Sequence, residues 1–360
     1  MKVGYAVLYT DGILVISKNH TILQKKIIKN YGEFEDTSVP WKDEYYQIKK
    51  VQILDQVESN CMKEWFEHCI NLITLIDFKN LDVSNCTDFS CMFGYCKSLQ
   101  DLNGLQTWNV SNGTDFKSMF FCCESLINLN NLQTWNISNC TDFSKMFAIC
   151  KSLQNINGLE NWNVSSGTNF SRMFEYCKSL QNLNGLENWN VSNGTDFSEM
   201  FNNCNSLHDL NELQNWNVSN GKDFSYMFYN CKLLQDISSL QTWTVSNGRN
   251  FSNMFYYCTS LQDINGLSNW NVSNGTDFSY MFFNCESLQD LNELQNWNVS
   301  NGKDFSYMFA LCESLHTVLE SNTLSILRKE MFYKCNPILK IHWKNHIYTY
   351  ADLLEYQTIS

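Results

Sequence analysis

Apolar side chains recur along this chain with a period of 27 residues. A typical repeat reads W-N-V-S-N-G-T-D-F-S-x-M-F-x-x-C-x-S-L-x-x-L-x-G-L-x-x, and nine such repeats run from Leu81 until the pattern degrades after Leu315. Half repeats flank them, with Phe66, Cys69 and Leu72 before and Met331, Phe332 and Cys335 after. The tryptophan slot is filled by Trp108, Trp135, Trp162, Trp189, Trp216, Trp243, Trp270 and Trp297. Such a fixed period predicts stacked units that share one continuous core.

Each repeat divides into two parts by the spacing of its apolar residues. From Leu99 to Trp108 every third residue is apolar, which favours a short extended segment turning one corner. From Asp115 to Cys123 the apolar residues fall at i, i+3, i+4 and i+7, which predicts a two-turn helix. Thr114 or Asp115 can cap that helix, and Asn112-Gly113 before it is a turn signal because both residues tolerate positive φ.

Paired strands are spaced about 4.8 Å per rung, whereas helices are about 10 Å wide. Because the two sides of a rung differ in width, we predict a curved α/β leucine-rich-repeat solenoid. Residues 57–320 form this solenoid of about nine units. Residues 1–56 form an N-terminal β cap, with a hairpin of strands 5–9 and 13–17 around Asp11-Gly12 and a further strand over 46–54. Residues 321–360 form a C-terminal capping segment.

Charge is concentrated in the repeats. Of a net charge of −12, the stretch 57–320 holds 12 basic and 27 acidic residues. An acidic body repels nucleic-acid phosphates, which argues against nucleic-acid binding and favours a protein partner, for which a basic protein would match the charge. The sequence contains no run of about 18 apolar residues, so we do not expect membrane insertion. The first residues, 1–19, lack a cleavable signal pattern, so we expect a cytoplasmic protein on the sequence as given.

The motif W-N-V-S-N-x-T-D-F-S-x-M-F-x-x-C-x-S-L resembles the repeats of BspA-like leucine-rich-repeat surface proteins. The resemblance covers roughly residues 1–320 in nine in-phase copies. It implies a leucine-rich-repeat fold and a role as an adhesin or interaction scaffold on a cell surface. That location is the alternative to the cytoplasm.

Ten of the 16 cysteines occupy one repeat slot, from Cys69 to Cys312. Parallel side chains in stacked slots disfavour disulfide geometry, so we expect a buried ladder of reduced thiols. Recurrent Asn-x-Ser/Thr sequences such as Asn109-Val110-Ser111 are interpreted as corner hydrogen bonds rather than glycan sites. Cys335, His342 and His346 lack a fourth metal ligand and are interpreted as part of the cap, and no cofactor is expected.

No catalytic motif is present, and equivalent residues on successive rungs do not converge as an active site requires. Two surfaces remain as candidate partner-binding sites. The first is a ladder of aspartates on the expected strand face: Asp101, Asp209, Asp236, Asp263 and Asp290. The second is a group of tyrosines on the variable, expected helix face: Tyr226, Tyr229, Tyr256 and Tyr280. Packing between neighbouring helices is an equal alternative explanation for the tyrosines.

The sequence therefore predicts a non-catalytic, protein-binding repeat protein of the adhesin or scaffold kind. The alternative is an intracellular acidic inhibitor or immunity protein that masks a basic toxin or nuclease. Of the two surfaces, the aspartate ladder is slightly favoured, because a curved repeat array offers its concave strand face as an extended site.

Overall fold

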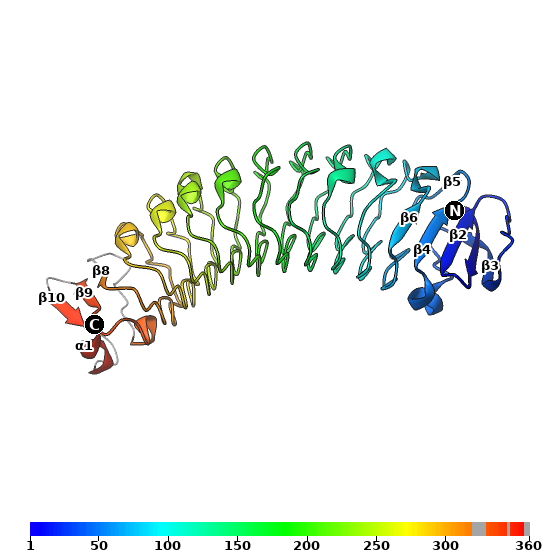
Figure 1. Ribbon diagram of the computed structural model, residues 1–360. Helices are drawn as coiled ribbons and strands as arrows, with labels where there is room; N and C mark the ends of the chain where they lie inside the picture. The colour runs from blue at the N-terminus through cyan, green and yellow to red at the C-terminus, as the bar shows by residue number, and fades with distance from the viewer. Residues whose placement is uncertain (319–328, 344–345, 356–360) are drawn as a thin grey trace. The chain divides into compact units, whose positions relative to one another are not determined.

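A computed structural model describes residues 1–318, 329–343 and 346–355 (Figure 1). The chain forms two compact units: residues 1–167, 176–178 and 184–189 make unit 1, and residues 168–175, 179–183 and 190–360 make unit 2. The strands are β1 Lys2–Tyr9, β2 Ile13–Ser17, β3 Ile27–Glu35, β4 Lys50–Ile53, β5 Val57–Glu58, β6 Thr74–Ile76, β7 Leu81–Asp82, β8 Thr317–Val318, β9 Lys340–Trp343 and β10 His346–Thr349.

The described helices are short and mostly of the 3-10 type. The 3-10 helices are η1 Lys42–Gln47, η2 Phe78–Asn80, η3 Leu105–Thr107, η4 Asn130–Leu132, η5 Asn211–Leu213, η6 Ser238–Thr242, η7 Asn265–Leu267, η8 Asn292–Leu294 and η10 Lys329–Phe332. The α-helix α1 spans Tyr350–Glu355, after the repeats.

The N-terminal cap is a five-stranded sheet of order β3-β1-β2-β4-β6. The predicted hairpin is confirmed, because β1 and β2 pair antiparallel with Val7 opposite Val15. The predicted strand over 46–54 is shorter, since η1 precedes β4. Strand β3 was not predicted. Parallel pairing of β4 with β6 joins the cap to the first rungs, so the sheet covers the end of their core.

The helix predicted in each repeat is wrong. The segment F-S-x-M-F-x-x-C instead forms two successive four-residue turns, in which Met92 N–H bonds to Phe89 O at 3.2 Å and Cys96 N–H to Phe93 O at 3.1 Å. The third residue of each turn, Cys91 or Tyr95, has a positive φ of 54° or 61°, as type II turns require at that place. Two such turns place apolar residues at i, i+3, i+4 and i+7, the same spacing as a helix face.

Every second amide group of this segment bonds to the next rung. Phe89 N–H donates to Asp115 O at 2.9 Å, Cys91 N–H to Lys117 O at 3.0 Å and Phe93 N–H to Met119 O at 2.8 Å. Amides thus alternate between a bond within the turn and a bond between rungs, which satisfies both without a helix. The helical layer expected to impose curvature is absent from the described rungs.

The opposite side of each rung is also not the predicted extended segment. It carries 3-10 turns such as η3, η5 and η8, while the isolated parallel bridges lie at the T-D-F aspartates, for example Asp88 to Asp115. The leucines and tryptophans of this side are buried, as predicted. The tryptophan Nε1 donates to a backbone carbonyl of the preceding rung, as Trp243 does to Leu213 O at 2.9 Å. Its ring stacks on Trp216 and Trp270 at 6.4 and 6.3 Å.

The Asn-Gly corner works differently from the prediction. Gly275 and its equivalents do not have positive φ; a Cβ on Gly275 would lie 2.3 Å from the Phe278 ring, so the slot is small because the ring approaches it. The asparagine before it bonds to the preceding rung, as Asn274 Nδ2 does to Ser246 O at 2.8 Å. Asn112 Nδ2 likewise bonds to Ser84 O at 2.7 Å, which confirms the corner hydrogen bonds predicted for the Asn-x-Ser/Thr sequences.

The repeat cysteines lie buried as free thiols. The ladder thiols donate to a phenylalanine carbonyl of the preceding rung, as Cys258 Sγ does to Phe228 O at 3.2 Å. Burial raises the pKa of the Cys258 thiol to about 12. The sulfur therefore acts as a buried neutral donor that links rungs.

At the C-terminal end, Phe309 N–H bonds to Met331 O at 2.9 Å, so the degraded half repeat continues the stack. β8 pairs with β9 in parallel and β9 with β10 antiparallel. The rest of the predicted cap, residues 321–328, 344–345 and 356–360, lies outside the described residues.

Trp243→Ala should lower the free energy of unfolding by about 3–5 kcal/mol, because it empties a large core site and removes the donor to Leu213 O. Urea unfolding followed by circular dichroism measures this loss. Thr244→Ala, at the exposed neighbouring residue, should change stability by no more than about 0.5 kcal/mol. Equal stability of the two variants would contradict a buried tryptophan column.

Thiol titration should find few reactive groups in the folded protein and all 16 after denaturation without reductant. The half-buried Cys61 and Cys91 should react first, since reactivity follows exposure. Cys91→Ser should remove one fast-reacting group. Near-absence of thiol in the denatured, unreduced protein would instead demonstrate disulfides.

Candidate functional site

Sequence variation among the repeats falls on three positions of the two-turn segment, which form three columns of side chains. Column 1 is the third residue of the first turn, column 2 the second residue of the second turn, and column 3 the residue after it. In unit 2, column 1 holds Arg172, Glu199, Tyr226, Asn253, Tyr280 and Tyr307. Column 2 holds Glu175, Asn202, Tyr229, Tyr256, Phe283 and Ala310, and column 3 holds Asn203, Asn230, Tyr257, Asn284 and Leu311.

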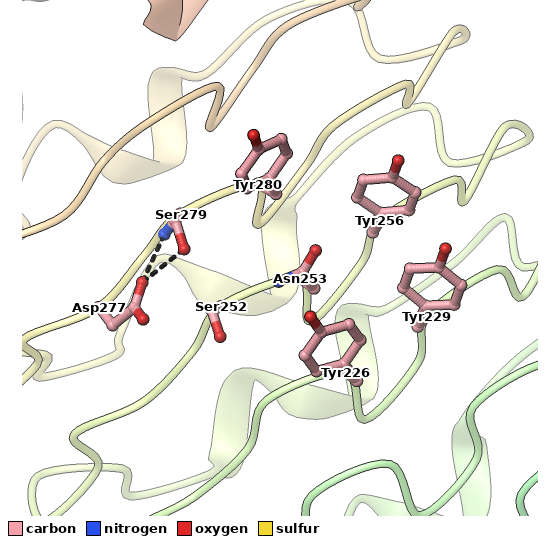
Figure 2. Close-up of a pocket in the computed structure, with 8 residues that line it drawn as sticks. All are labelled: Tyr226, Tyr229, Ser252, Asn253, Tyr256, Asp277, Ser279 and Tyr280. Carbon is pink, nitrogen blue, oxygen red and sulfur yellow. Dashed lines mark hydrogen bonds between the residues drawn. The ribbon is translucent and has the colours of Figure 1, made fainter.

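The four tyrosines predicted as a site come together around one open hollow of about 510 Å³ (Figure 2). Tyr226 and Tyr280 come from column 1, and Tyr229 and Tyr256 from column 2. Their hydroxyl groups point to the same side in Figure 2. The remaining lining residues are Ser252, Asn253, Asp277 and Ser279.

Rung spacing brings the rings of column 2 into face-to-face stacks. Tyr256 lies between Tyr229 and Phe283, with centroids 4.7 Å away on each side and interplanar angles of 7°. In column 1, Tyr280 stacks on Tyr307 at 5.1 Å. The alternative explanation for the tyrosines, packing against one another, is therefore correct for part of their surface, yet Tyr226 remains 37% exposed.

Burial raises the pKa of Tyr256 to about 12, and the neighbouring tyrosines Tyr229, Tyr257, Tyr280 and Tyr226 add to the effect. The phenol is therefore neutral at physiological pH. It offers a ring edge and a hydroxyl that can donate or accept a hydrogen bond.

One residue of the T-D-F aspartate column, Asp277, lines the hollow. Asp277 Oδ1 accepts hydrogen bonds from Ser279 N–H at 2.9 Å and from Ser279 Oγ at 2.6 Å. Asn250 makes the same two bonds with Ser252, at 3.1 and 2.8 Å. Parallel bridges link Asp223, Asn250, Asp277 and Asp304 in sequence. In unit 1, burial raises the pKa of Asp115, and the adjacent carboxylates of Asp88 and Asp142 raise it further.

Sequence reasoning missed Asp277, Asn253 and the two serines of this hollow. The T-D-F aspartate looks structural because it recurs in most repeats. The available signal was the break in column 1, where a short Asn253 stands between Tyr226 and Tyr280 when the chain is aligned every 27 residues.

The predicted aspartate ladder does not lie on a strand face, which corrects its expected placement. Asp209, Asp236, Asp263 and Asp290 precede the 3-10 turns, and each Oδ1 accepts the N–H of the residue two positions on, at 2.7–3.2 Å. Asp101 does the same for Asn103 at 3.0 Å. These carboxylates are half-buried or exposed, and none of the five lines the tyrosine hollow. Their first role is to close a local turn.

Among the described residues, no group of three or more histidine, cysteine or acidic side chains is arranged to hold a metal ion. Cys335 donates its thiol to Phe309 O at 3.0 Å, and the side chains of His342 and His346 lie outside what the structure describes. In the same described part of the chain, no helix has the length and apolar character to cross a membrane.

Comparison with solved structures gives matches along nearly the whole chain at low identity. A leucine-rich cell-surface protein from Faecalibacterium prausnitzii A2-165 is 16% identical with a TM-score of 0.43, covering 96% of this chain and 95% of its own. A leucine-rich-repeat protein from Eubacterium ventriosum is 13% identical with a TM-score of 0.31, covering 92% of both chains.

A third similar structure is the functional domain of InlJ from Listeria monocytogenes, which is described as including a cysteine ladder. It is 11% identical with a TM-score of 0.22, and the match covers 84% of this chain and 64% of that one. No curated protein matches this sequence. The leucine-rich-repeat architecture of this chain, with its 27-residue spacing and N-terminal β cap, is visible in its own rung-to-rung hydrogen bonds.

One protein family matches the repeats directly, over residues 60–182, 150–264 and 234–342. These overlapping matches span most of the chain. The chain therefore belongs to the family described as "Mycoplasma protein of unknown function, DUF285".

Proposed function

We propose that this chain is a non-catalytic protein-binding repeat protein, and that its partner docks on the tyrosine hollow of unit 2. It would act as an interaction scaffold or adhesin, as the resemblance to BspA-like surface proteins implies. The observation that carries the proposal is the gathering of Tyr226, Tyr229, Tyr256 and Tyr280 on the variable columns around one open hollow.

The columns suit recognition because the core does not constrain them. Tryptophan, leucine, phenylalanine and cysteine slots hold the rungs together and barely change, whereas column residues range from Arg172 and Glu199 to tyrosine. Clustered tyrosines supply rigid contact area at a low cost in conformational entropy and are typical of binding hot spots. Stacking on neighbours fixes the rings before a partner arrives.

The second candidate function is masking of a basic partner by the acidic body, in the manner of an inhibitor or immunity protein. The T-D-F column favours it, because Asp196, Asp223, Asp277 and Asp304 stand on one line of unit 2. A cytoplasmic location would suit this function, and a cell-surface location would suit the first.

Capture of partners from the native source should distinguish the two surfaces predicted from the sequence, the tyrosines and the aspartate ladder. Changing Tyr226, Tyr229, Tyr256 and Tyr280 to serine should abolish capture. Changing Asp209, Asp236, Asp263 and Asp290 to asparagine should leave it intact, because asparagine closes the same turn, as Asn128 does for Asn130 N–H at 3.2 Å. The captured proteins are compared by mass spectrometry. Loss only in the aspartate variant would assign the function to the ladder, and retention by both variants would exclude both surfaces.

Once a partner has been captured, the salt dependence of its affinity should distinguish the two functions. Contacts with the tyrosines should give an affinity that decreases only slightly as salt rises and falls by about 2 kcal/mol in Tyr256→Ala. Tyr176→Ala, at an exposed column residue of unit 1, serves as the control and should bind normally. Calorimetric titration at low and high salt measures this. A steep loss of affinity with salt would favour the acidic inhibitor, because exposed charges are screened within about 8 Å at physiological ionic strength.

A further inference from the structure

Column 1 of unit 2 contains a gap where one ring is missing. Tyr226, Asn253, Tyr280 and Tyr307 occupy this column on successive rungs. Tyr280 stacks on Tyr307 at 5.1 Å, so neighbouring tyrosines in this column do form a continuous stack. Asn253 has a shorter side chain and leaves a slot between the rings of Tyr226 and Tyr280. Figure 2 shows these two tyrosines on either side of Asn253.

The slot has the thickness of one planar group. Two rung steps of about 4.8 Å separate Tyr226 from Tyr280, which gives ~10 Å between the rings. A planar group that contacts both rings at about 3.5–4 Å requires a ring-to-ring separation somewhat smaller than this. A small tilt of either tyrosine would bring the rings to that separation. On the next rung after Tyr280, column 1 holds the ring of Tyr307 in place of a short side chain such as Asn253.

The groups around the slot differ in chemistry. Tyr226, Tyr256 and Tyr280 line the hollow with aromatic rings, and Asn253 lies between Tyr226 and Tyr280. Asp277 lies to one side, and in the described part of the chain both hydrogen bonds of its carboxylate end on Oδ1. Lys222 and Arg249 line a separate hollow with Asn247, Asn274 and Thr276, which shares no residue with this one. The slot therefore combines electron-rich ring faces with a carboxylate.

We propose that this slot binds the guanidinium group of an arginine side chain on a partner protein. The proposal rests on the proposed function of the tyrosine hollow and specifies what the partner presents to it. A guanidinium is planar and always charged, stacks on tyrosine faces and pairs with a carboxylate. An ammonium group matches the charge of the site but not the flat shape of the slot.

The probes for the test are N-acetyl-arginine amide and its lysine and citrulline counterparts. Citrulline keeps the planar shape and loses the charge. Titration into protein with 13C-labelled tyrosines should give saturable shifts at the Tyr226 and Tyr280 rings with the arginine probe. The lysine and citrulline probes should bind at least about tenfold more weakly than the arginine probe. Equal binding of arginine and citrulline would overturn the proposal.

Two substitutions at Asn253 test the slot without disturbing the scaffold. Asn253→Tyr should complete the stack and abolish arginine binding, whereas Asn253→Ala leaves the slot open and should retain it. The backbone accepts tyrosine here, because Asn253 has φ of 58° and Tyr226, Tyr280 and Tyr307 have 56°, 57° and 55°. Unfolding curves confirm that both variants fold. Arginine binding by the tyrosine variant would contradict the proposal.

Asp277→Asn tests the carboxylate. Asn250 already makes the same two bonds to its serine, so the turn should persist while the charge is lost. Arginine affinity should fall about tenfold. Unchanged affinity would show that the carboxylate takes no part and would overturn the proposed chemistry.

The two proposals can fail separately. No saturable shift with the arginine probe on the unmodified protein would refute the slot, even if the four-serine variant loses its captured partner. Arginine binding with no dependence of capture on the tyrosines would keep the slot and refute the hollow as the partner surface.

Discussion

The backbone hydrogen bond from one rung to the next is the interaction on which this structure depends. It joins Phe89 N–H to Asp115 O and recurs through the described repeats, as at Phe251 N–H to Asp277 O. Because every second amide of the two-turn segment is used in this way, each rung must stay in register with its neighbours. Register then brings like side chains together, which explains the tryptophan stacks, the cysteine-to-carbonyl bonds and the tyrosine stacks.

The sequence predicted the repeat, its phase and its core, because these follow from the composition of single slots. The buried tryptophans and thiols, the asparagine corner bonds and the N-terminal hairpin were all correctly placed. The local conformation of F-S-x-M-F-x-x-C was not. Two four-residue turns and a two-turn helix put apolar residues at the same positions, and only the hydrogen-bond partner of each amide distinguishes them. That partner lies 26 residues away, beyond the reach of a local pattern.

The candidate site was predictable to the level of its tyrosines. Their position on variable slots marked them, and the structure brings all four to one hollow. The contribution of Asp277 could not be foreseen, because a residue repeated on most rungs carries no local signal and its nearness to the tyrosines depends on turns in place of a helix. For the aspartates before the 3-10 turns, only the expected strand-face placement was wrong. Their regular spacing suggested a functional ladder, and their carboxylates also close local turns.

The variable columns have a consequence for how such a protein could diversify. Residues 212–228 and 293–309 are identical, so whole stretches of this array have already been copied. A copied rung arrives with its backbone geometry and neighbours intact, and the surface it carries is shifted by one step. Duplicating the rungs around Asn253 would yield a second slot like the first. The number of binding sites would then follow the number of repeats, and no new type of contact would have to evolve.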